Sequence, residues 1–61
     1  MYTITLKEKP KNKLYIRDAS IWLLTNMGLP GDAYTVNFTD DGIRVNFVEE
    51  KDAIHFSLVW Q

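Results

Sequence analysis

Polar and apolar residues alternate along two short stretches near the start of the chain, residues 3–7 and residues 14–17. The join between them, residues 7–13, is polar and contains a proline. Pairing Leu6 with Leu14 brings the apolar residues of both stretches to one face in a single register. The pattern therefore predicts two strands joined as a hairpin.

From Asp18 onward the pattern changes to one typical of a helix. Asp18 or Ser20 can cap the first turn, and residues 21–24 are continuously apolar. Gly28 follows at the position where a helix often ends in a left-handed residue, and Pro30 prevents continuation. Because the apolar run covers more than one face, we expect this short helix to be buried from two sides.

The second half of the chain predicts an antiparallel meander. An Asp-Gly pair at residues 41–42 suits a two-residue type I′ turn, and counting outward from it sets Phe38 opposite Val45. A further turn at residues 50–51 leads into a third alternating stretch, residues 53–60. In this register, the apolar residues of all three strands share one face.

The predicted element order is β-β-α-β-β-β, an α+β fold that is mainly β, in one domain spanning residues 1–61. A chain this short buries only about 60% of the surface that it exposes when unfolded. It has no cysteine for a disulfide and a single histidine, His55, which excludes a typical structural zinc site. The hydrophobic fraction of 46% therefore favours a homodimer with a shared core.

The stretch from the predicted helix into the next strand carries a spaced motif. It consists of Gly28, Leu29, Gly31, Asp32, Tyr34 and Val36. This spacing resembles the AbrB/MazE/SymE superfamily of swapped-hairpin domains, with residues 3–48 as the common core and residues 53–60 as an added C-terminal strand. The resemblance implies an intertwined homodimer, in which the hairpins of two chains interlock.

Charge is distributed unevenly along the chain. Residues 1–31 carry a net charge of +3 and residues 32–61 a net charge of −4. In the swapped-hairpin family the first hairpin faces DNA, so the resemblance implies duplex DNA as a partner of the basic residues Lys7, Lys9, Lys11, Lys13 and Arg17. Solvated lysines on an exposed hairpin are the alternative interpretation, since such charges also keep a strand edge unpaired.

Large apolar side chains provide candidates for a dimer or protein interface. We select Tyr15, Ile21, Trp22, Leu24 and Trp60. Trp22 is expected in the dimer core. Trp60 either closes the barrel of strands or lies on an edge that is offered to another protein.

Catalytic residues, a metal site and cofactors are not expected. His55 and Ser57 share a strand face in the predicted fold, but their side chains would point outward in parallel. No apolar stretch approaches the length of a membrane span, and the start of the chain lacks the features of a signal peptide. We therefore expect a cytoplasmic protein that is not an enzyme.

The sequence leads to two main functional hypotheses. The first is a small homodimeric DNA-binding transcriptional regulator or antitoxin of AbrB/MazE type. The second is a protein-interaction module, such as a phage- or plasmid-type inhibitor, that binds its partner through the acidic C-terminal half. It is favoured by the absence of basic residues between Asp18 and Pro30. A SymE-like toxin is a third possibility.

Overall fold

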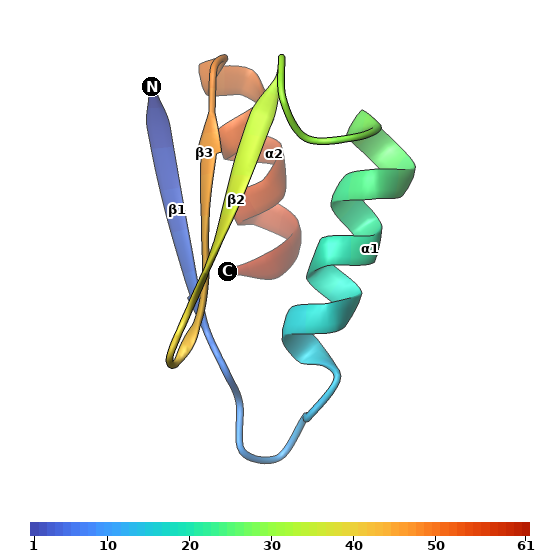
Figure 1. Cartoon of the computed structure of the whole chain (residues 1–61), viewed down its shortest axis with the longest axis vertical. Coiled ribbons are helices and arrows are strands. Elements are labelled where there is room, and N and C mark those ends of the chain that lie inside the picture. The colour runs from blue at the N-terminus through green and yellow to red at the C-terminus, as the bar shows by residue number, and fades with distance from the viewer.

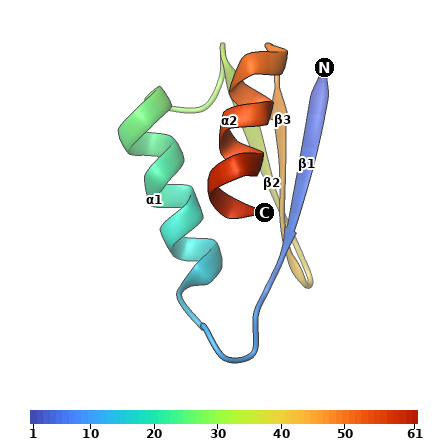
Figure 2. The ribbon, with the colours of Figure 1, turned by 180° about the vertical axis from the view of Figure 1, so that it is seen from behind.

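The computed structural model describes residues 1–61 as a small α+β fold (Figure 1). Its elements are β1 (Tyr2–Lys7), α1 (Tyr15–Met27), β2 (Tyr34–Thr39), β3 (Gly42–Phe47) and α2 (Glu50–Trp60). The three strands form an antiparallel sheet in the order β1-β3-β2. Both helices lie on the same side of this sheet, as the view from behind also shows (Figure 2).

The middle strand β3 is paired on both of its edges. Ile4 of β1 and Val36 of β2 both lie opposite Val45. The predicted strand over residues 3–7 and the predicted hairpin after the first helix are thus confirmed. The third strand of the sheet, however, is β1 and not the predicted strand over residues 53–60. The predicted pairing of β3 with residues 53–60 is wrong, because β1 already occupies that edge.

The hairpin turn lies one residue earlier than predicted. Thr39 is opposite Gly42, so Asp40 and Asp41 form the two-residue loop, and Phe38 faces Ile43 instead of Val45. No residue of this loop has a positive φ, which excludes the predicted type I′ turn. The register moves by two residues, and a shift of two keeps every side chain on its predicted face.

Gly42 is required by a close approach of two backbones. A Cβ atom at this position would lie 1.9 Å from the carbonyl oxygen of Leu6. Only glycine lets β1 reach β3 at this point, since real Cβ atoms never come so near another atom. The absence of a side chain at Gly42 therefore allows β1 to pair with β3.

Helix α1 begins at Tyr15, so the predicted strand over residues 14–17 and its hairpin are wrong. Tyr15, Ala19 and Leu23 recur every four residues and are buried against the sheet. Four alternating residues are too few to outweigh this helical spacing. The helix ends as predicted at Gly28, which has a φ of 82° and donates its N–H to the carbonyl of Leu24.

Residues 53–60 are helical and belong to α2, which corrects the predicted C-terminal strand. Ala53 and Phe56 are buried, and Trp60 packs against the same core. This i, i+3, i+7 spacing is that of a helix face. Glu50 and Asp52 in the first turn favour the helix further, because negative charge is stabilising near its N-terminus.

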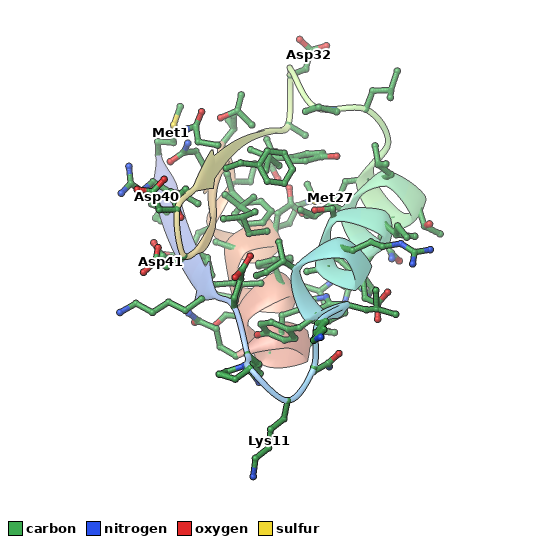
Figure 3. All side chains as sticks on the ribbon, turned by 60° about the horizontal axis from the view of Figure 1, so that its bottom comes forward. Met1, Lys11, Met27, Asp32, Asp40 and Asp41 are labelled. Carbon is green, nitrogen blue, oxygen red and sulfur yellow. The ribbon has the colours of Figure 1, made fainter.

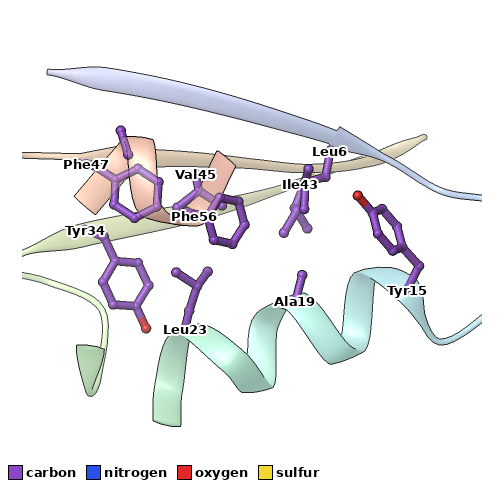
Figure 4. Packing of buried hydrophobic residues seen from close by; sticks show 10 residues of the cluster. Leu6, Tyr15, Ala19, Leu23, Tyr34, Ile43, Val45, Phe47 and Phe56 are labelled. Atoms are coloured by element: carbon purple, nitrogen blue, oxygen red, sulfur yellow. The ribbon is translucent and has the colours of Figure 1, made fainter. Parts of the chain in front are cut away.

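The core fills the space between the sheet and the two helices (Figure 4). Its largest fully buried side chains are Tyr34, Phe47, Phe56, Leu23, Ile43 and Val45. The ring centroids of Phe47 and Phe56 lie 5.4 Å apart, which joins α2 to β3. Each such aromatic contact contributes about 0.5–1.5 kcal/mol beyond the area it buries.

The other face of the sheet is polar and exposed. Thr3 of β1 donates its hydroxyl to the Asn46 side chain at 2.8 Å, and the Asn46 amide donates to the hydroxyl of Thr35 at 3.3 Å. These bonds cross all three strands in one row. No helix covers this face (Figures 1 and 2).

The close approach at Gly42 leads to a prediction. Replacing Gly42 with Asn is expected to lower the free energy of unfolding by about 2 kcal/mol or more, because the added Cβ collides with the Leu6 carbonyl. Asn is well tolerated in a type I′ turn, so this variant separates the two explanations of the glycine. Urea denaturation measures the change. A Gly42→Asn protein as stable as the wild type contradicts the β1–β3 contact, and Asp40→Asn is the control.

Candidate functional site

Of the predicted basic residues, Lys9, Lys11 and Lys13 lie on the loop between β1 and α1, and Lys7 is the last residue of β1. Lys7, Lys9 and Lys13 line an open hollow of about 600 Å³, and Asp40 and Asp41 from the β2–β3 turn line the same hollow. The Glu8 N–H donates to the Asp41 carbonyl at 2.6 Å, which holds loop and turn together. Figure 3 shows Lys11 at the tip of the loop, pointing away from the body of the protein.

The acidic turn weakens the positive charge of this basic loop. Lys7, Lys9, Lys11 and Lys13 contribute +4, and Glu8, Asp40 and Asp41 contribute −3, which leaves +1. The Lys9 ammonium lies 4.2 Å from the centroid of the Tyr15 ring, a cation–π contact that directs it toward the protein. Arg17 is exposed on the first turns of α1 and does not line the hollow.

Three of the predicted interface aromatics make contacts within the chain. The Tyr15 hydroxyl donates to the Trp60 carbonyl, and the two rings meet edge to face with centroids 5.7 Å apart. Trp22 packs against Phe56 and His55 of α2, with centroids 5.7 Å and 5.1 Å away. These side chains hold α1 against α2, and only Ile21 and Leu24 of the predicted set are exposed apolar residues.

An apolar surface that the sequence did not reveal lies along the outer side of β2 and α1. We call it the α1–β2 flank; its groove, of about 190 Å³, is lined by Ser20, Leu24, Pro30, Tyr34, Val36 and Phe38. Phe38 is 75% exposed, the highest value of any aromatic side chain described for this fold. It lies on the helix side of the edge strand β2, level with the buried Ile43, but neither helix covers it.

The edge of β2 on this flank has free backbone groups. The Val48 N–H donates to the Ala33 carbonyl. The backbone N–H and C=O groups of the odd-numbered residues of β2 therefore point toward β3, and those of the even-numbered residues point away from the sheet. The Tyr34 carbonyl accepts a bond from the Gly31 N–H at 2.7 Å, which leaves the outward groups of Val36 and Phe38 unpaired within the chain. An extended segment can pair with such an edge.

A second apolar groove lies between β1 and α2. It has a volume of about 510 Å³ and is lined by both elements, with Met1, Tyr2 and Ile4 on one side and Ile54 and Leu58 on the other. Leu58 is 81% exposed. We call this surface the β1–α2 groove.

Acidic residues gather at the end of the sheet where β1 and β2 begin. A shallow hollow there is lined by Asp32, Glu49, Lys51 and Asp52, and Glu50 lies at the neighbouring end of the β1–α2 groove. Lys51 pairs with Glu49 at 3.3 Å. The acidic residues of the C-terminal half therefore form two separate groups, one at this end of the sheet and one in the Asp40–Asp41 turn at the opposite end.

The remaining candidates for chemistry are dispersed. His55 and Ser57 lie on a helix, where residues two apart point to different sides, so the predicted shared strand face is wrong. No group of three or more His, Asp or Glu side chains lies close enough together to hold a metal ion. Neither helix is long and apolar enough to cross a membrane.

Comparisons with known proteins add no relative: neither a protein-family model nor a curated protein nor a solved structure matches this chain.

Tyr34, which forms the floor of the α1–β2 flank, gives a pH-dependent prediction. Its hydroxyl donates to the Gly28 carbonyl at 2.7 Å, and burial raises the pKa of this hydroxyl above its ordinary value. Since the folded state holds the proton more tightly, Tyr34 stabilises the fold below pH ~10, and this contribution falls as the pH rises further.

Tyr34→Phe is expected to cost about 1 kcal/mol near neutral pH and to reduce the loss of stability above pH ~10. Thermal unfolding of both proteins between neutral pH and alkaline pH measures the difference. The exposed Tyr2→Phe variant is the control. Parallel stability curves for Tyr34→Phe and wild type above pH ~10 would contradict the assignment.

Proposed function

We propose that this protein is a non-catalytic protein-binding module whose contact surface is the α1–β2 flank. The observation that carries the proposal is the exposed apolar groove of Leu24, Val36 and Phe38 beside the unpaired edge of β2. Exposed apolar surface next to free backbone donors and acceptors is the chemistry that binds an extended segment of another protein.

The charges around β2 define the kind of segment that fits. Asp32 precedes the strand, and Asp40 and Asp41 follow it, so both ends of this edge are acidic. A partner strand with apolar residues at alternate positions would fill the groove. Basic residues at its two ends would meet these carboxylates, and this complementarity favours correct partners over acidic ones.

Selection from a library of displayed peptides tests the proposal. We expect enrichment of extended sequences with alternating apolar residues between flanking lysines or arginines. Phe38→Asp is expected to weaken binding of a selected peptide about 30-fold or more, because a central aromatic contributes about 2 kcal/mol. Leu14→Asp, which changes an exposed apolar residue that immediately precedes α1 and does not line the groove, is the matched control. Equal binding by Phe38→Asp and wild type would overturn the proposal.

DNA binding is the second candidate. It is supported by the four lysines at the end of β1 and in the β1–α1 loop, and by the resemblance to the AbrB/MazE/SymE superfamily. A homodimer of regulator or antitoxin type would present two such loops to phosphate groups. We rank it below protein binding, because Asp40 and Asp41 reduce the net charge of the loop region to +1.

Titration of duplex DNA over a range of salt concentrations tests this second candidate. If the loop binds phosphate, replacing Lys9, Lys11 and Arg17 with Glu is expected to abolish binding, since each lost contact removes salt-dependent affinity. Lys51→Glu at the acidic end is the control. The DNA hypothesis fails if the wild type does not bind at low salt, or if the triple variant binds equally well.

A further inference from the structure

The outer edge of β1 is a second strand edge without a partner in the chain. Glu8 donates its N–H to the Asp41 carbonyl, so the backbone N–H and C=O groups of the even-numbered residues of β1 point toward β3. The peptide groups of Thr3, Thr5 and Lys7 therefore point away from the sheet. Among these outward groups, the Thr5 carbonyl accepts a weak bond of 3.2 Å from the exposed Gln61 side chain.

We infer that this edge pairs with the same edge of a second copy of the chain, forming a symmetric dimer with one continuous six-stranded sheet. The two β1 strands run antiparallel, with the two-fold axis at Ile4. In this register Thr3 of each copy lies opposite Thr5 of its partner, and each such pair exchanges two backbone hydrogen bonds. The axis relates identical patches, as a closed two-fold interface requires.

The apolar side of β1 selects this register. Its residues on the helix side of the sheet are Tyr2, Ile4 and Leu6. An axis at Ile4 places Ile4 against Ile4 of the partner, and Tyr2 against Leu6 of the partner. A register moved by two residues, with its axis at Thr5, places Tyr2 against the charged Glu8 of the partner instead.

The β1–α2 groove provides the apolar area that a dimer needs. Ile54 and Leu58 lie on the rim of this groove at 52% and 81% exposure, beside Ile4. The axis at Ile4 brings the two grooves together, so that these side chains pack between the two α2 helices. A standard interface buries about 800 Å² per partner, roughly a fifth of the 4360 Å² surface of this chain.

Charge favours β1–β1 pairing over the other edge pairings. The Lys7 end of β1 adjoins the basic loop, and the Met1 end adjoins the acidic end at Glu50. Antiparallel β1 strands place each basic loop near the acidic end of the partner. Pairing β2 with β2 instead brings Asp32 of one copy toward Asp40 and Asp41 of the other, which is repulsive.

Pairing of β1 with β2 of another copy is less favourable in both directions than pairing of two β1 strands. The basic Lys7 end of β1 meets one acidic end of β2, but the acidic Met1 end of β1 then meets the other acidic end. Such head-to-tail contacts also leave a free edge on each side, so they produce open chains of molecules instead of a dimer. The proposed dimer leaves β2 free, and its failure would not affect the α1–β2 flank.

Sedimentation and a pair of Thr5 variants test whether this edge forms the dimer. The wild type is expected to dimerise reversibly. Thr5→Pro removes an outward N–H and leaves the bonds between β1 and β3 in place, because edge strands tolerate proline at such positions. It is expected to weaken dimerisation about a hundredfold, whereas Thr5→Val, which keeps the N–H, remains dimeric. A monomeric wild type at millimolar concentration, or a fully dimeric, folded Thr5→Pro, overturns the proposal.

Disulfide trapping tests the register and decides the question if Thr5→Pro fails to fold. The chain has no cysteine, so single-cysteine variants report defined contacts. A mixture of Thr3→Cys and Thr5→Cys is expected to form the mixed disulfide, since paired residues in the ladder have Cα atoms about 5.5 Å apart. In the control mixture, Thr35→Cys on β2 takes the place of Thr3→Cys and is combined with Thr5→Cys. Equal crosslinking in the test and control mixtures contradicts β1–β1 pairing.

Discussion

The contact between Gly42 and the Leu6 carbonyl allows β1 to lie directly against β3, and the rest of the fold depends on this pairing. With β1 on one side and β2 on the other, β3 has no free edge, and Ile43, Val45 and Phe47 on its helix side are completely buried. The C-terminal segment then has no edge of β3 left to join. It folds instead as α2, which places Phe56 on Phe47 and closes the core.

A sheet of three strands with two helices on one side has two consequences for function. Both outer strands keep unpaired backbone groups, and each has an exposed apolar side chain at its edge: Phe38 on β2 itself, and Leu58 of α2 beside β1. The charges at the strand ends distinguish the two edges. Acidic residues at both ends of β2 favour a basic segment of another protein, whereas opposite charges at the ends of β1 favour its own copy.

Much of this fold could be predicted from the sequence. The strand over residues 3–7, the helix end at Gly28 and the second hairpin follow from alternation and from turn residues. The prediction failed where two periods coexist: Ile54, Phe56 and Leu58 alternate as in a strand, while Ala53, Phe56 and Trp60 have helical spacing. Only the occupied edge of β3 decides between them. The exposure of Phe38 could not be predicted, because it depends on how α1 lies relative to the edge strand β2.

The most direct test of this account is the exchange of β1 amide hydrogens, followed by NMR in dilute and in concentrated solutions. The N–H groups of Ile4 and Leu6 face β3, so we predict that they are protected at every concentration. Those of Thr3 and Thr5 point outward, so we predict fast exchange in dilute solution and protection as the dimer forms. Rapid exchange at Ile4 and Leu6 would contradict the fold, and unprotected Thr3 and Thr5 in concentrated solution would contradict the pairing of two β1 strands.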